Sequence, residues 1–244
     1  SEDGKSAAMI EVNAETDFVA KNETFKEFVR GILKTILERR PADMEALLPM
    51  QYLDTDFTVE GKLKDAIATI GENMNIRRFE KVSCDNGIVV DYIHAGGKIG
   101  VLVAAETDST SDAVVECLKN VAMQVAAMNP KYLSSADVSD EYKEKEKEVL
   151  LAQAKNDPKN AGKPDEIIEK MILGRLNKEL KEVCLTEQLY VKAENKESVA
   201  KYVDMVAKEN GCNITLKQFV RFETGEGLEK KNEDFAAEVA SQLK

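Results

Sequence analysis

The apolar positions near the start of the chain predict a strand followed by a long helix. Residues 8–12 are largely apolar and predict a strand that ends at a turn at Thr16-Asp17. In residues 25–37 the apolar side chains fall three and four positions apart, as on one face of a helix. Thr24 and Glu27 have the spacing of a capping box, which predicts that the helix begins at Thr24.

The next stretch predicts a second helix and then a run of short strands. Apolar residues keep helical spacing through residues 63–70, and Gly71 marks the end of that helix. Residues 77–103 alternate in polarity, with interruptions at 85–87 and 95–97. Asn86-Gly87 within the first interruption is a strong signal for a two-residue hairpin. We therefore expect a β-meander, in which consecutive strands pair.

The second half of the chain is mostly helical by pattern. A helix is predicted through residues 114–125, before Asn129-Pro130. Two charge-rich helices, 140–155 and 164–183, are joined by a Pro/Gly/Asn segment and predict an antiparallel helical hairpin. The remaining expected elements are a strand at 189–191, a helix at 198–208, a strand at 216–222 and a terminal helix from Asn232.

One short motif occurs twice, each time between a predicted strand and a predicted helix. Glu15-Thr16-Asp17 recurs as Glu106-Thr107-Asp108 with similar surroundings. The copies differ at the next position, where the first has Phe18 and the second has Ser109. The repeat predicts a duplicated α+β scaffold. Because the second copy manages without an aromatic ring, we expect Phe18 to serve a function other than folding.

Composition limits the kinds of function that are open to this chain. Its 244 residues are 43% hydrophobic and 32% charged, which is typical of a folded protein. A net charge of −11 argues against non-specific binding to the phosphates of nucleic acid. No apolar run is long enough for a membrane span, and the N-terminus does not resemble a secretory signal.

The cysteines and the one histidine exclude the usual zinc sites. Cys84, Cys117, Cys184 and Cys212 are widely spaced without a CxxC pair, and His94 is the only histidine. We expect reduced, mostly buried thiols, which are typical of a cytosol-like compartment.

No motif for nucleotide binding or for acyl transfer is complete. Gly4-Lys5-Ser6 lacks the preceding strand and glycine of a phosphate-binding loop, and Gly96-Gly97-Lys98 is followed by Ile99. There is no G-x-S-x-G motif to accompany His94. The residues therefore favour a binding protein without a cofactor or a resident metal.

The candidate residues each have a structural interpretation as well. Phe18 could fold back into the core, and Phe57, in a second Thr-Asp-Phe triplet, is expected to act as a hydrophobic staple at the start of a helix. His94 could be an ordinary exposed turn residue, and residues 70–73 could be a simple helix C-cap.

Five blocks, in order along the chain, carry a family signature. They are residues 12–22 (VNAETDFVAKN), residues 70–78 (IGENMNIRR), residues 92–94 with 99–103 (YIH and IGVLV), Gly162-Lys163-Pro164 with Glu169-Lys170-Met171 and Gly174-Arg175, and Arg221-Phe222-Glu223 with Gly225-Glu226-Gly227 and residues 234–239 (DFAAEV). Together they span essentially the whole chain, and they resemble the elongation factor Ts family.

With the internal repeat, this resemblance implies an α+β fold of duplicated antiparallel-sheet-plus-helix subdomains with an inserted antiparallel coiled-coil hairpin. The expected parts are an N-terminal core subdomain (1–76), a C-terminal core subdomain in two pieces (77–137 and 185–226), the helical coiled-coil hairpin (138–184) and a C-terminal helical module (227–244). The family also begins with a small helical domain. This sequence starts inside the first sheet without it, as a processed or trimmed form would.

The function implied by the resemblance is guanine nucleotide exchange on elongation factor Tu, the GTPase that carries aminoacyl-tRNA to the ribosome. Such a factor binds the GDP form, displaces Mg²⁺ and promotes the exchange of GDP for GTP, without being an enzyme itself. By analogy, Phe18 wedges between two helices of the partner. The implied contact residues are Thr16, Asp17, Phe18 and Val19 for Mg²⁺ displacement, Ile70, Gly71 and His94 on the same partner domain, and Val191 on a second domain.

Two other classes of function stay open at this stage. One is a non-catalytic scaffold that binds a partner through the helical hairpin, and the other is a hydrolase that uses His94. The expected location is the bacterial cytoplasm or the interior of a plastid or mitochondrion. We expect no direct nucleic-acid or membrane partner, and association with the ribosome is left open.

Overall fold

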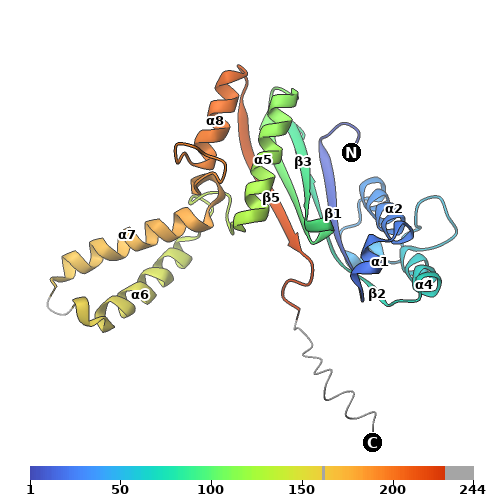
Figure 1. Cartoon of the computed structure of the whole chain (residues 1–244), viewed down its shortest axis with the longest axis horizontal. Coiled ribbons are helices and arrows are strands. Elements are labelled where there is room, and N and C mark those ends of the chain that lie inside the picture. Colours follow the sequence, from blue (N-terminus) through green and yellow to red (C-terminus); the bar gives the residue numbers. More distant parts are fainter. Residues whose placement is uncertain (161–162, 229–244) are drawn as a thin grey trace, which may run out of the picture.

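A computed structural model describes residues 1–160 and 163–228 of the chain, and it combines helices with small antiparallel sheets (Figure 1). The fold is therefore α+β, as expected from the sequence. In chain order the main elements are β1 (Ser6–Ala14), α1 (Asp17–Lys21), α2 (Glu23–Arg39), α3 (Met44–Leu47), α4 (Val59–Ile70), β2 (Met74–Ser83), β3 (Gly87–His94), β4 (Ile99–Thr107), α5 (Asp112–Met128), α6 (Asp140–Asn156), α7 (Asp165–Val183), α8 (Val199–Glu209) and β5 (Ile214–Glu223).

The strands form two sheets rather than one meander. β1 pairs antiparallel with β2, and β3, β4 and β5 form a second antiparallel sheet in that order. The predicted hairpin at Asn86-Gly87 is therefore wrong, because the chain leaves the first sheet there and enters the second. The physical reason is that the two strands serve different cores: Met74 and Ile76 of β2 pack with α2 and α4, whereas Ile88 and Val90 of β3 pack with α5.

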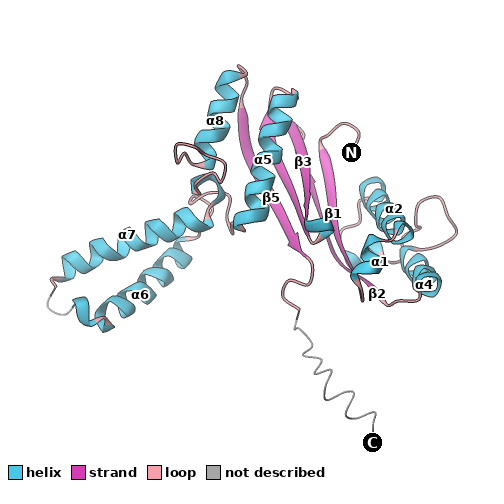
Figure 2. Ribbon diagram, in the orientation of Figure 1, coloured by secondary structure: helices cyan, strands magenta, loops and turns pink. Residues whose placement is uncertain are grey.

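The two sheets lie against each other in the middle of the molecule, with helices outside them (Figure 2). Alternation along β4 explains this arrangement, because neighbouring side chains point to opposite faces. Val101, Val103 and Ala105 face the cluster around α5 and α8, while Leu102 and Ala104 pack against Met9 and Val82 of the first sheet. Side chains on both faces of the strand are therefore buried.

The start of α2 differs from its prediction. Its N-cap is Asn22, whose Oδ1 accepts a hydrogen bond from the Thr24 backbone N–H at 2.8 Å. The Thr24–Glu27 capping box is therefore wrong. The cause is the short helix α1, which follows Thr16 directly and ends at Asn22, so that one residue closes α1 and opens α2.

The start of α4 is capped by Thr58, the residue after Phe57. The Phe57 ring is 45% exposed, and its centroid lies 5.4 Å from the Nζ of Lys62, a cation–π contact. Phe57 is therefore used within its own chain. The hydrophobic staple expected for Phe57 stays a prediction.

Helices α6 and α7 lie side by side and extend away from the body next to α8 (Figure 1). An apolar seam holds them together, with Leu150 and Ala154 from α6 facing Ile168, Ile172 and Leu176 from α7. The helix pair expected from the charge-rich segments is thus present at nearly the predicted boundaries.

Two predictions for the C-terminal part need separate mention. The strand expected at 189–191 is wrong, since only an isolated bridge between Leu189 and Ser198 forms there. The terminal helix from Asn232, and the module 227–244 beyond its first two residues, lie outside the described residues.

The cysteines are free thiols, three of them buried and Cys212 partly exposed, as expected. None of the helices in the described part of the chain has the length and apolar character needed to cross a membrane.

Candidate functional site

Phe18 is the most exposed of the large apolar side chains in the described residues, with 81% of its surface accessible. It is the second residue of α1, which follows β1 after a short turn. The next residue, Val19, is only 6% exposed and packs into the cluster under α2 and α4. Val19 therefore anchors the short helix, and the ring beside it points outward. The structural interpretation, in which Phe18 is a core residue, is wrong.

The start of α1 is tied to the loop that follows α4. The Thr16 Oγ1 donates to Glu72 Oε1 at 2.8 Å, and the Thr16 backbone N–H donates to Glu72 Oε2 at 3.1 Å. Asn73 adds a hydrogen bond from its Nδ2 to Glu15 Oε1 at 2.9 Å. This clamp brings the predicted Ile70-Gly71 turn next to the predicted residues 16–19.

Sequence reasoning left Glu72 and Asn73 out of the site, although they follow Gly71 directly. Gly71 has a φ of 83°, a left-handed conformation that favours glycine and ends α4. The reversal sends the next two side chains back toward Thr16. A glycine C-cap followed at once by a carboxylate and an amide was the signal that could have found them.

Asp17 lies at the first turn of α1 and faces solvent, where it pairs with Lys21 at 3.0 Å. The pKa of its carboxyl is held below the ordinary value by the hydrogen bond and charge of Lys21, with a smaller contribution from the charge of Lys98. Asp17 is thus ionised at neutral pH and accessible to a partner.

His94 ends β3 and is exposed at that turn. Its ring stacks on Tyr92 with centroids 5.9 Å apart, and its Nδ1 lies 3.1 Å from the Tyr92 hydroxyl. Ile93 between them is 59% exposed. The hydrogen-bond partner of the histidine is thus a tyrosine, an arrangement that orients the ring.

Val191 lies elsewhere, in the segment between α7 and α8. Its backbone N–H donates to the Oε1 of Gln124, a buried side chain on α5, at 2.9 Å. The side chain of Val191 is 48% exposed, and Leu189 beside it is 60% exposed. The structure therefore brings the predicted residues 16–19 and 70–71 together, with His94 at the end of β3, and leaves Val191 as a separate apolar point bonded to α5.

The second copy of the motif is engaged inside the protein. Asp108 accepts hydrogen bonds from the backbone N–H and the side-chain Nδ2 of Asn213, both at 2.8 Å. These bonds fix the beginning of β5 to the end of β4. Ser109, in the place of Phe18, donates its backbone N–H to Thr107 Oγ1 at 3.2 Å.

Comparison with known proteins identifies the family of this chain. The family model described as Elongation factor TS matches residues 15–226. The chain belongs to the elongation factor Ts family. It is therefore a translation factor that promotes guanine nucleotide exchange.

Curated relatives match nearly the whole chain. Elongation factor Ts of Trichlorobacter lovleyi is 49% identical over 243 residues, which cover 98% of this chain and 76% of that protein. Elongation factor Ts of Clostridium novyi is 49% identical over 244 residues, covering 100% of this chain and 78% of the relative.

Proposed function

We propose that the exchange factor acts on elongation factor Tu carrying GDP, and that Phe18 is the residue that enters the partner. The exposure of this ring is the observation that carries the proposal. A short helix anchored by Val19 and clamped through Thr16 to Glu72 presents an apolar ring to solvent in a fixed place. The apolar cluster that buries Val19, the next residue, does not include the ring.

A single ring cannot account for the whole effect. An acceleration of GDP release of about 10⁴-fold needs a barrier lower by roughly 5.5 kcal/mol. Burying one phenylalanine contributes about 2–3 kcal/mol. Further contacts must supply the rest, and His94, Ile70 and Gly71 are the candidates for them. Val191 would add a contact to a second domain of the partner.

Asp17 would act together with the ring. Its carboxylate is ionised and exposed next to Phe18. When Phe18 separates two helices of the partner, a negative charge arrives near the groups that hold Mg²⁺ and helps to displace them. Binding and nucleotide release are coupled reciprocally, so a factor that prefers the nucleotide-free form must weaken nucleotide binding by the same free energy.

The scaffold fits a duplication with one functional copy. β1 leads to α1 and α2, and β4 leads to α5, so both copies of the motif join a strand to a helix. On this basis the first core subdomain extends past the expected boundary at residue 76 to the end of β2, because residues 78–83 pair with β1, and residues 87–137 with 185–226 form the other. Residues 138–184 form an inserted antiparallel coiled-coil hairpin, whose packing seam supports this division.

The proposed setting is the translation apparatus of a bacterial cytoplasm or an organelle interior. Both named relatives are bacterial, and the free cysteines suit a reducing compartment. The net charge of −11 favours a protein partner over nucleic acid.

The test is the rate of GDP release from elongation factor Tu loaded with fluorescent GDP, measured by stopped flow at saturating factor. Phe18→Ala should lower the rate about 30-fold or more if the ring is fully buried in the partner, the equivalent of about 2 kcal/mol. The melting temperature should stay within a few degrees of the wild type, because the ring has few contacts in its own chain.

Phe57→Ala is the matched control, since Phe57 lies in the other Thr-Asp-Phe triplet and stacks on Lys62. It should leave the saturated rate nearly intact. Equal losses for the two variants, or a Phe18→Ala variant that exchanges normally, would contradict the proposal. A factor that binds without changing the GDP release rate would instead be a scaffold.

A further inference from the structure

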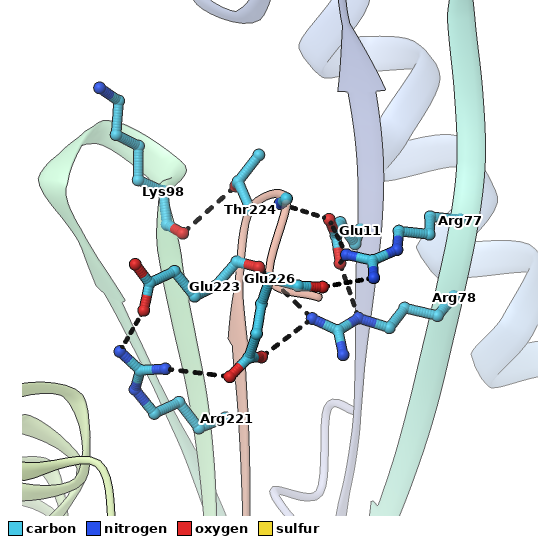
Figure 3. Close-up of polar contacts among 9 residues, drawn as sticks. Glu11, Arg77, Arg78, Lys98, Arg221, Glu223, Thr224 and Glu226 are labelled. Carbon is cyan, nitrogen blue, oxygen red and sulfur yellow. Dashed lines mark hydrogen bonds and ion pairs between the residues drawn. The ribbon is translucent and has the colours of Figure 1, made fainter. Parts of the chain in front are cut away.

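A cluster of arginine and glutamate side chains joins the two sheets (Figure 3). It lies between β1, which leads to Phe18, and the end of β5, where Glu223 pairs with Ile99 just after the turn that follows His94. Strand ladders join β1 only to β2, and β4 to β3 and β5, within the part of the chain that the structure describes. Between the sheets the main contact is a small apolar cluster that includes Met9 and Leu102. Apolar contacts are not directional, so the angle between the sheets depends on directional bonds. One is the hydrogen bond from the Val89 backbone N–H of β3 to the Gly4 carbonyl oxygen before β1, at 2.8 Å, and the charged cluster supplies others.

Glu11 of β1 is the centre of this cluster. It is 5% exposed, and its carboxylate accepts hydrogen bonds from Arg77 Nη1 at 2.9 Å, Arg78 Nε at 2.6 Å and the Gly225 backbone N–H at 2.9 Å. Burial alone would raise the pKa of this carboxyl, but the hydrogen bonds from Gly225, Arg77 and Arg78 outweigh it and leave the pKa below the ordinary value. The carboxylate is therefore a buried anion with three donors from two parts of the chain.

A β-bulge explains how two adjacent arginines reach one carboxylate. Neighbouring residues of a regular strand point to opposite faces of the sheet. Here Glu11 pairs with Arg78 and Val12 pairs with Ile76, so Arg77 is an extra residue without a partner in the ladder. Such an insertion turns a side chain to a new direction, and in this case it brings both guanidinium groups to Glu11.

The loop after β5 is held from both sides. Arg77 donates to the Glu226 carbonyl oxygen, and Arg78 pairs with the Glu226 carboxylate at 3.3 Å. On the other side, the Thr224 backbone N–H donates to the Lys98 carbonyl oxygen at 2.8 Å. Lys98 follows the turn that carries His94. Residues 223–226 therefore connect the strand that leads to Phe18 with the turn that presents His94.

We propose that Glu11 is a positioning residue for nucleotide exchange, which holds Phe18 and His94 in the mutual arrangement that the partner meets. The inference rests on the proposed function of Phe18. Glu11 is buried and cannot contact a partner directly. Its effect on exchange comes from fixing the two sheets relative to each other. A buried ion pair gives little net stability, because desolvation offsets the attraction. Directional bonds between two bodies nevertheless specify one orientation, which an apolar contact does not.

The decisive variant is Glu11→Gln, which keeps the shape of the side chain and removes the charge that gathers Arg77, Arg78 and Gly225. Glu80→Gln is the matched control, with the same chemical change at an exposed position of β2. The saturated rate of GDP release from elongation factor Tu should fall about tenfold for Glu11→Gln and stay unchanged for Glu80→Gln. Hydrogen exchange at the Gly225 amide should become faster only in Glu11→Gln.

A double-mutant cycle separates positioning from a general loss of stability. In the wild-type background Phe18→Ala should lower the saturated rate about 30-fold. In the Glu11→Gln background Phe18→Ala should lower the saturated rate by less than about tenfold, because a ring that is already displaced contributes less to exchange. Equal costs in the two backgrounds would overturn the inference, as would a wild-type saturated rate for Glu11→Gln.

Glu226→Gln provides a milder variant in case Glu11→Gln folds poorly. It removes the pairing with Arg78 and leaves the Arg77 and Gly225 bonds to Glu11 in place, so a loss of about twofold to threefold is expected. A wild-type rate for Glu226→Gln would overturn the inference if Glu11→Gln cannot be purified. If Phe18→Ala alone promotes exchange at the wild-type rate, the proposed function is wrong, and this inference, which rests on it, is wrong as well.

Discussion

The two Glu-Thr-Asp motifs occupy equivalent places after a strand, yet their side chains are used in opposite ways. In the second copy, Asp108 binds Asn213 and so joins β4 to β5. In the first copy, Asp17 forms an ion pair with Lys21 of its own short helix, and Phe18 beside it is 81% exposed. One copy serves internal cohesion, and the other presents its residues to solvent.

The difference shows how a repeated scaffold can gain a binding function. The first copy does not use its aspartate to hold a neighbouring strand, and its stability comes from Val19 in the core and from the Thr16–Glu72 clamp. An exposed phenylalanine does not contribute the stabilising free energy of about 2–3 kcal/mol that its burial would give. That free energy remains available for binding a partner, which is where we expect it to be realised.

The largest expected effect comes from exchanging the residues that distinguish the copies. The double variant Phe18→Ser, Ser109→Phe should release GDP from elongation factor Tu about 30-fold more slowly at saturation, because the ring is then absent from α1. Stopped-flow fluorescence measures the rate, and circular dichroism verifies folding. If the ring works equally well at position 109, the first copy has no special role.

A smaller effect is expected from loosening the clamp under the first copy. Glu72→Gln should lower the saturated exchange rate about fivefold, since a lost hydrogen bond to a charged group is worth about 1 kcal/mol. Glu60→Gln on α4 is the control, because Glu60 pairs with Lys64 on the same helix. Indistinguishable rates for these two variants would show that Thr16 needs no clamp.

The second copy should respond in stability and hardly in exchange. Asp108→Ala removes both bonds to Asn213 and should lower the melting temperature by more than Asp17→Ala does, because only Asp108 ties two strands together. The exchange rate per folded molecule should stay near the wild-type value. A loss of exchange at full folding would mean that the end of β5 also takes part in the function.

The smallest expected effect is a difference in the salt dependence of two pKa values. The pKa of Asp17 is lowered chiefly by Lys21, and that of Asp108 chiefly by the backbone and side-chain hydrogen bonds of Asn213. Salt screens the exposed ion pair and should raise the pKa of Asp17 toward its ordinary value, while the pKa of Asp108 stays low. Titration followed by NMR at two salt concentrations measures both.

The same shifts fix the direction of the acid response. Because both folded-state pKa values are lowered, each aspartate stabilises the fold fully above the unfolded pKa of about 3.9, and that stability is lost as the pH falls through the folded value. At high salt the contribution of Asp17 should shrink and that of Asp108 should persist. The opposite result would reverse the roles that the structure gives to the two copies.

Much of the fold could be predicted from local patterns. Helical spacing located α2, α4, α5 and α8, and the charge-rich segments located α6 and α7. The pairing of β2 could not be predicted, because adjacent strands with a turn signal between them pair in many proteins. Here the pairing was decided by which core each strand buries, with Met74 in one core and Ile88 in the other.

The candidate site divides in the same way. The contrast between Phe18 and Ser109 was visible in the sequence and predicted an exposed ring, which the structure confirms. Glu72 was missed because its partner Thr16 is far away along the chain. Glu11 was missed because the bulge that gathers Arg77 and Arg78 around it exists only in the paired sheet.

By itself, the sequence determined the longer helices, most of the strands, the repeated motif and the place of the unmatched ring. These features depend on neighbouring residues, whose spacing alone sets which face of an element is apolar. The tertiary structure decided which strands pair, which carboxylates are clamped, and that one aspartate joins two strands while its counterpart faces solvent. Those outcomes depend on groups that are far apart in the sequence and come into contact only in the folded chain. Once they are buried, the charge of each group and the direction of its hydrogen bonds decide which partner it takes.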